Sequence, residues 1–138
     1  MATIRAYTTI EQSRKLAKIL PLETADMYYH WYIEEDGDTI ESGHRITTPN
    51  IGNFITHKVN KMILPCWSLA ALLEQLPYEL CDDDGNSVYL QINKENDVYQ
   101  LVYTDPYGEF ESIETDRYEH FVDACYEMII HLNELNLL

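Results

Sequence analysis

A row of histidines and carboxylates near the end of the chain is the first candidate for chemistry. Its members recur at helical spacing and would share one side of a helix: His120, Asp123, Glu127, His131 and Glu134. Imidazole and carboxylate groups one turn apart can bind a transition metal. A metal site also needs ligands from a second element, and a solvated helix face carries the same residue types without any ligand role. We therefore expect a solvated face, with no metal and no other cofactor.

Cys66 is the second candidate, because it precedes a helix that we expect to begin at Ser68. A helix N-terminus can lower the pKa of a thiol, and His57 upstream could act as its general base. Nucleophilic catalysis would also need an orienting group and an oxyanion hole, and the sequence specifies neither. Between Pro65 and Trp67, Cys66 is more typical of a small buried hydrophobe.

The sequence lacks several common catalytic and metal-binding motifs. It contains no glycine-rich phosphate loop, no G-x-S-x-G and no H-E-x-x-H. The acidic run 82–86 fails as a calcium loop, because its glycine would require a first ligand at Leu80. We therefore expect that the protein is not an enzyme. A small thiol- or metal-dependent hydrolase stays open as an alternative.

Aromatic residues give the signal for a binding surface, since tyrosine is enriched at protein interfaces. The chain has eleven tyrosines. Some alternate along an expected strand, and others follow one flank of the expected final helix. The predicted interaction surface comprises Tyr28, His30, Tyr32, Val122, Tyr126 and Ile130. For Tyr28 and Tyr32, burial under another layer of the same chain is the alternative.

In the first part of the chain, the pattern predicts a helix followed by a hairpin. Thr8 and Glu11 have capping-box spacing, and Pro21 should end the helix. Residues 27–35 alternate as a strand, and Asp36-Gly37 suits a two-residue type I′ turn. That turn would place Ile33 opposite Ile40, Trp31 opposite Ser42 and Met27 opposite Ile46. Residues 47–64 fit either a helix or a strand.

The second part predicts a short helix, three strands and a long helix. The short helix would begin at Ser68 and end before Pro77. Strands are expected at 88–93 and 98–104 around the turn 94–97, with a third at 109–113. The final helix would begin near Thr115 or Asp116 and continue to the C-terminus.

These elements predict an α+β fold: an antiparallel sheet built from hairpins, with helices packed on one face. The segments Leu16–Glu23 and Leu72–Glu79 both end a helix with Leu-Pro-x-Glu. This similarity suggests a pseudo-repeat, for which proline-terminated helices in general are the alternative explanation. Residues 1–138 would form a single α+β domain, with 1–64 and 65–138 as its candidate halves.

The charge of the chain favours some partners over others. The net charge is −15, and residues 65–138 hold sixteen acidic residues against Lys94 and Arg117. Such a surface repels phosphate backbones and anionic membranes. We therefore expect no membrane association and no direct nucleic-acid binding, with the basic first helix as the one exception left open. The expected partner is an unidentified, basic protein, and a charge that serves solubility alone is the alternative. A homodimer is a further alternative. The three cysteines form no C-x-x-C pair, which is typical of reduced thiols in a cytoplasmic protein.

Three segments resemble a family of small uncharacterised proteins from gut Bacteroidales genomes, often found in prophage or mobile-element regions. The segments are Thr24–Tyr28, Pro65–Pro77 and Asp123–Met128 followed by His131-Leu132. The resemblance implies a bacterial or phage origin and a cytoplasmic setting, and it supplies no catalytic residues. The sequence thus predicts a non-enzymatic binding or accessory protein of a mobile element. A specialised alternative is an acidic inhibitor that mimics nucleic acid on a basic host protein.

Overall fold

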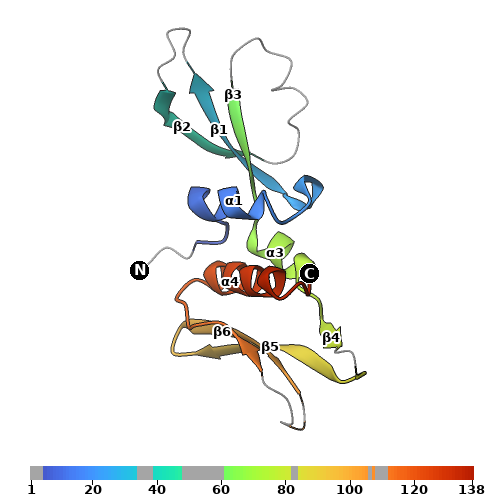
Figure 1. Ribbon diagram of the computed structural model, residues 1–138. Helices are drawn as coiled ribbons and strands as arrows, with labels where there is room; N and C mark the ends of the chain where they lie inside the picture. Colours follow the sequence, from blue (N-terminus) through green and yellow to red (C-terminus); the bar gives the residue numbers. More distant parts are fainter. Residues whose placement is uncertain (1–4, 34–38, 48–60, 82–83, 106, 108–111) are drawn as a thin grey trace. The chain divides into compact units, whose positions relative to one another are not determined.

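The computed structural model describes residues 5–33, 39–47, 61–81, 84–105, 107 and 112–138 (Figure 1). Helices and two antiparallel sheets make up the fold, which confirms the α+β prediction. The strands form two sheets where the sequence suggested one. The chain divides into a first unit, residues 7–71, and a second unit, residues 1–6 with 72–138. This division falls inside helix α3 (Leu69–Gln75), later than the predicted division after residue 64.

The first unit contains a short helix and a three-stranded sheet. Its elements are α1 (Ile10–Leu16), the 3₁₀ turn η1 (Leu22–Thr24), β1 (Met27–Ile33), β2 (Thr39–Thr47) and β3 (Lys61–Cys66). The strand order is β2-β1-β3. Residues 47–64 fitted either a helix or a strand from the sequence. Residues 61–64 are shown to be strand, because they belong to β3 and pair with β1. The Leu-Pro-x-Glu pseudo-repeat is not confirmed, because the two units have different sheet orders.

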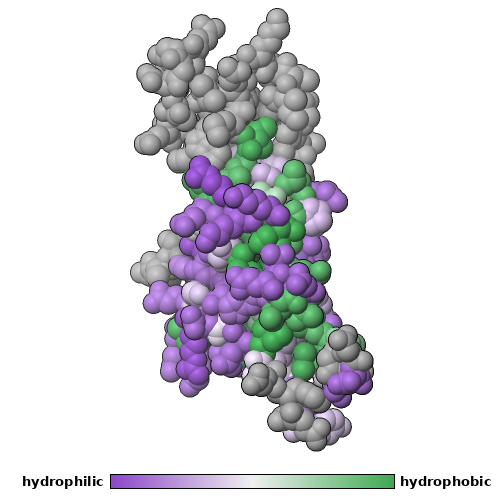
Figure 2. Space-filling view, in the orientation of Figure 1, coloured by the Kyte–Doolittle hydropathy of each residue, from purple (hydrophilic) through white to green (hydrophobic). Residues whose placement is uncertain are grey.

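The cap of α1 differs by one residue from the prediction. The Thr9 hydroxyl accepts a hydrogen bond from the Gln12 amide at 3.1 Å, and the Gln12 side chain accepts one from the Thr9 amide at 2.9 Å. Thr8 and Glu11 do not form the capping box, because Thr8 is fully buried and its hydroxyl is bonded elsewhere. Basic residues on the exposed side of α1 contribute to the hydrophilic surface over this helix (Figure 2).

The predicted register of the first hairpin is wrong. Ile33 pairs with Thr39 and Tyr32 with Ile40, but His30 pairs with Arg45. Residues 41–44 of β2 therefore lie opposite Trp31 alone, which is an irregularity that strict alternation cannot predict. The Asp36-Gly37 turn from which the register was derived lies outside the described residues.

The second unit packs one long helix on a four-stranded sheet. Its elements are the C-terminal part of α3, β4 (Glu79–Cys81), β5 (Ser87–Glu95), β6 (Val98–Thr104), β7 (Ile113–Glu114) and α4 (Phe121–Glu134). The strand order is β4-β5-β6-β7, and α4 contacts β6 (Figure 1). Leu101 and Tyr103 of β6 are fully buried, as are Cys125, Met128 and Leu132 of α4. These residues form the core between helix and sheet.

The predicted start of α4 is also wrong. The backbone of Tyr118 exchanges two hydrogen bonds with Tyr99, at 2.7 and 2.9 Å, so the chain is still extended beyond Thr115 and Asp116. The helix begins only at Phe121, whose ring stacks on Tyr99 with the centroids 5.0 Å apart. Of the expected third strand, residues 109–111 lie outside the described part of the chain, and β7 begins at Ile113.

Candidate functional site

The outer face of the four-stranded sheet, opposite α4, is the best candidate for a functional surface. Side chains alternate between the two faces of a strand, and Tyr99 and Leu101 lie on the α4 side. The strand pairings then assign the outer face to Glu79, Cys81, Ser87, Tyr89, Gln91, Asn93, Glu95, Val98, Gln100, Val102, Thr104 and Glu114. Glu79, Gln91, Glu95 and Glu114 are exposed. This face therefore presents polar side chains to solvent.

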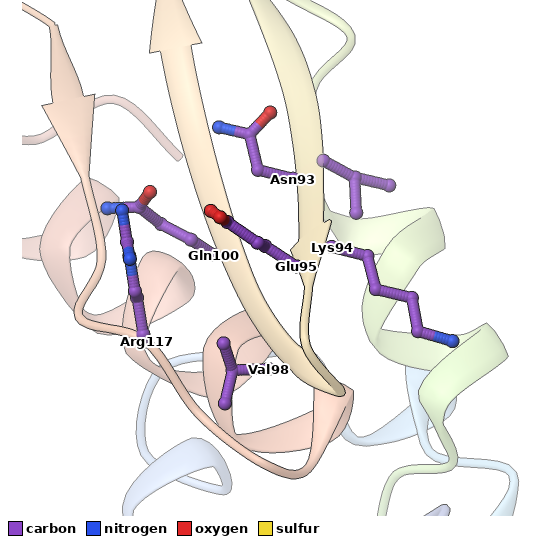
Figure 3. Close-up of a pocket in the computed structure, with 7 residues that line it drawn as sticks. Asn93, Lys94, Glu95, Val98, Gln100 and Arg117 are labelled. Atoms are coloured by element: carbon purple, nitrogen blue, oxygen red, sulfur yellow. The ribbon is translucent and has the colours of Figure 1, made fainter.

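A hollow of about 470 Å³ lies at one end of this face. Asn93 and Glu95 of β5, Val98 and Gln100 of β6, and Arg117 line it from the outer face. Ile92 and Lys94, which alternate toward the other side of β5, also border the hollow. Figure 3 shows the polar ends of Asn93, Glu95, Gln100 and Arg117 on one side of the hairpin, with Lys94 directed away from them. The volume falls within the range of small-ligand sites, about 300–1,000 Å³.

Two amide side chains in the hollow are held by neighbouring groups. The Gln100 Nε2 atom donates a 2.9 Å hydrogen bond to the carbonyl of Thr115. The Gln91 Nε2 atom donates one of 2.9 Å to Asn93 Oδ1. These bonds leave Gln100 Oε1 as an acceptor and Asn93 Nδ2 as a donor for a ligand.

Charges of both signs flank these amides. Glu95 and Arg117 are both exposed. Within the described part of the chain, Arg117 makes no ion pair; the pairs found there are Arg5–Asp123 and His131–Glu127. The second unit as a whole holds three basic and sixteen acidic residues, a net charge of −13. Arg117 is thus an uncompensated positive group on a strongly negative unit.

Four residues of the histidine and carboxylate row, His120, Asp123, Glu127 and His131, make contacts within the second unit. Asp123 pairs with the Arg5 side chain, and His120 Nδ1 accepts a 3.3 Å hydrogen bond from the Arg5 amide. Glu127 accepts a 3.1 Å hydrogen bond from the Asp116 amide and lies 3.5 Å from His131 Nε2. Among the described residues, no group of three or more potential ligands could hold a metal ion.

Neither buried thiol has the environment of a nucleophile. Cys66 is fully buried, and its Sγ lies 3.5 Å from both the carbonyl and the hydroxyl oxygen of Thr8. Burial raises the pKa of the Cys66 thiol, although hydrogen bonds from Thr8 and its neighbours oppose the shift. The predicted role of Cys66 as a small buried hydrophobe is confirmed, and the alternative of a pKa lowered by the helix N-terminus is not supported. Burial raises the pKa of Cys125 to about 12. The predicted base, His57, lies outside the described residues.

The residues of the predicted aromatic surface differ in how far they are buried. Val122 is fully buried on α4 and cannot belong to an exposed surface, which corrects that prediction. Tyr28, Tyr126 and Ile130 are half-buried. His30 and Tyr32 lie on β1, but their side chains are outside the described part.

Sequence reasoning missed Asn93, Gln100 and Arg117. Their signal was present in the alternation of the second hairpin, which puts Asn93, Glu95, Val98 and Gln100 on one face. Arg117 was hidden because residues 115–118 were assigned to a helix. The extended backbone at Tyr118 brings this segment beside β6 instead.

No protein-family profile, curated protein or solved structure matches the chain. No helix in the described residues is long and apolar enough to cross a bilayer. The function must therefore be argued from the outer face and its charges.

Proposed function

We propose that the protein is a non-enzymatic binding protein that acts through protein–protein contacts made by the outer face of the four-stranded sheet. The observation that carries this proposal is the polar hollow between Asn93, Glu95, Gln100 and Arg117 on a unit of net charge −13. One face of the sheet is in contact with α4. The other face carries Gln91, Asn93, Glu95 and Gln100, which are exposed or partly exposed around the buried Val102, and we assign partner binding to this face.

The charge of the second unit selects a basic partner. A field of one sign accelerates encounter with an oppositely charged protein and suppresses like-charged competitors. Nucleic acids carry the same sign as this unit and are disfavoured as direct ligands. On the outer face Arg117 lies near Glu95, so the face mixes signs. A general protein partner is therefore a better fit than recognition as a nucleic-acid mimic.

A mobile-element accessory role is the biological setting that we propose. It is supported by the resemblance of the segments Thr24–Tyr28 and Pro65–Pro77 to small Bacteroidales proteins. The buried thiols and the internally bonded row on α4 favour binding over hydrolysis.

Photo-crosslinking from defined positions tests the proposed function. A photoreactive residue at Gln91, exposed on the outer face, is expected to form adducts with a basic protein in Bacteroidales cells. The matched control position is Ala70, which is exposed in the first unit. The captured protein is then purified, and its affinity is measured for the wild type and for Gln91→Trp. Equal adducts from both positions, or unchanged affinity with Gln91→Trp, would contradict the proposal.

A further inference from the structure

We infer that the hollow on the outer face binds an extended, lysine-rich segment of the partner, with Arg117 pairing to a carboxylate in that segment and Glu95 to a neighbouring cationic side chain. This inference rests on the proposed function and names the part of the partner that is bound. The carboxylate is either the segment's C-terminus or an aspartate or glutamate side chain.

Arg117 is the anchor of this site. Its guanidinium is exposed beside the Gln100 amide (Figure 3), and within the described part of the chain it makes no ion pair. A guanidinium presents its N–H groups in a planar fork that fits a carboxylate in two hydrogen bonds. None of the acidic side chains in the described part of this unit forms an ion pair with Arg117, so we assign its guanidinium to a ligand.

The two amides are suited to peptide backbone. Gln100 is bonded to Thr115 and Asn93 to Gln91, which leaves Gln100 Oε1 and Asn93 Nδ2 for a ligand. One accepts and the other donates, which matches the N–H and C=O groups of an extended chain. Because the side chains are already ordered by these bonds, binding costs little additional rotamer entropy.

The surrounding charge restricts which carboxylates can bind. The net charge of −13 repels a free anion, so a small acid alone is a poor ligand for Arg117. A lysine-rich segment overcomes this repulsion, and Glu95 provides a contact for one of its ammonium groups. The expected ligand is therefore a carboxylate flanked by lysine side chains.

Peptide binding distinguishes a contact with Arg117 from attraction by net charge alone, because the two predict opposite orders of affinity. The probes are short, labelled peptides of alternating lysine and alanine, one with a free C-terminal carboxylate and one amidated. A third is amidated with a central aspartate, and a fourth has asparagine at that position. Fluorescence anisotropy with the full-length protein at low ionic strength gives the affinities.

Net attraction alone makes the more positive peptide of each pair bind more tightly. A contact with Arg117 gives the reverse order, with the carboxylate-bearing peptide favoured by up to about fivefold. The first pair tests whether the carboxylate is the C-terminus of the segment, and the second pair tests whether it is a side chain. A preference within either pair supports the inference, and no preference in both pairs overturns it.

Matched variants assign the effect to the hollow. Arg117→Gln is expected to abolish the carboxylate preference, whereas Arg14→Gln, which removes an exposed charge from the first unit, preserves it. Glu95→Gln should weaken all four peptides by more than Glu79→Gln, which makes the same change elsewhere on the outer face. A preference that survives Arg117→Gln contradicts the inference. Circular dichroism confirms that each variant is folded.

Failure of this inference is distinguishable from failure of the proposed function. If the crosslinked partner binds through Gln91 but is unaffected by Arg117→Gln, the carboxylate contact is refuted and the outer-face function stands. If Gln91 captures no specific partner, the function itself fails, whatever the peptides show.

Discussion

The hydroxyl of Thr8 accepts a 3.1 Å hydrogen bond from the backbone amide of Trp67. The amide of Thr8 in turn donates a 3.0 Å hydrogen bond to the Trp67 carbonyl, and both residues are fully buried. Two segments far apart in the sequence are thereby joined just before α1 and just after β3. This pairing explains why Thr8 does not cap α1.

Removing the Thr8 hydroxyl should destabilise the first unit. Thr8→Val keeps the shape of the side chain but leaves the buried Trp67 amide and the Ser13 hydroxyl, 2.7 Å away, without this partner. A buried unsatisfied donor costs about 1–3 kcal/mol, and we expect a loss of that size in urea unfolding. Ser112→Ala, at an exposed position, is the control and should change stability by less than about 0.5 kcal/mol. Equal losses of stability in Thr8→Val and Ser112→Ala would show that the Thr8 hydroxyl does not stabilise the first unit.

Local patterns predicted most of the elements, but they missed β4, left β3 undecided and did not show how distant segments pair. The alternation of 88–93 and 98–104 located β5 and β6, and β6 buries Leu101 and Tyr103 on the side that α4 contacts. The bulge opposite Trp31 and the pairing of β1 with β3 depend on contacts across the chain. Neither follows from periodicity.

The candidate site was less predictable than the fold for the same reason. Arg117 reaches the hollow only because Tyr118 pairs with Tyr99 and delays α4. Acidic residues and Thr115 had suggested a helix start there, and local cap signals were outweighed by sheet pairing. The buried position of Cys66 was consistent with its apolar neighbours, whereas its bonds to Thr8 required the tertiary structure.

One cysteine should react rapidly in the native protein. Cys81 is exposed, while Cys66 and Cys125 are fully buried. An aromatic disulfide reagent is therefore expected to titrate one thiol quickly at pH 8 and all three after denaturation. Cys81→Ser should remove the fast phase. Rapid modification of Cys66 in that variant would contradict the buried thiol and revive a nucleophilic role.

Alkaline pH should destabilise the second unit through Cys125. Its thiol pKa is 9.0 in an unperturbed chain and about 12 when buried in the fold, so above pH 9 the unfolded state loses its proton first. Fewer protons on the unfolded state mean that stability falls as pH rises through this window, by up to about 1.4 kcal/mol per pH unit. Below pH 9 this effect is absent.

Unfolding free energies between pH 8 and 11 check this sign. Cys125→Ala lowers stability at every pH because it leaves a cavity, but it should flatten the slope above pH 9. Cys81→Ser, an exposed thiol, should leave the slope unchanged. Burial also raises the pKa of Tyr103 and Tyr118, which adds to the decline above pH 10 in all variants. An unaltered slope in Cys125→Ala would refute the assignment.

The turn between β5 and β6 offers a stabilising substitution. Asn96 and Asp97 have φ of 50° and 62°, which is the left-handed pair of a two-residue type I′ turn and not the four-residue loop expected from the sequence. Asparagine tolerates this region, and glycine at the second position avoids the steric cost that an L-residue meets there.

Asp97→Gly is therefore expected to raise the free energy of unfolding by about 0.5–1 kcal/mol, despite the greater entropy of glycine in the unfolded chain. Asp97→Ala removes the same charge but, unlike glycine, does not relieve the strain of a positive φ, so it should destabilise the turn. Asp97→Val should destabilise it further, because a β-branched residue is poorly accommodated at positive φ. Urea unfolding of the three variants ranks them. Equal changes in unfolding free energy for Asp97→Gly and Asp97→Ala would show that removal of the charge, and not backbone strain, sets the stability of the turn. This turn pairs Glu95 with Val98 at the edge of the hollow.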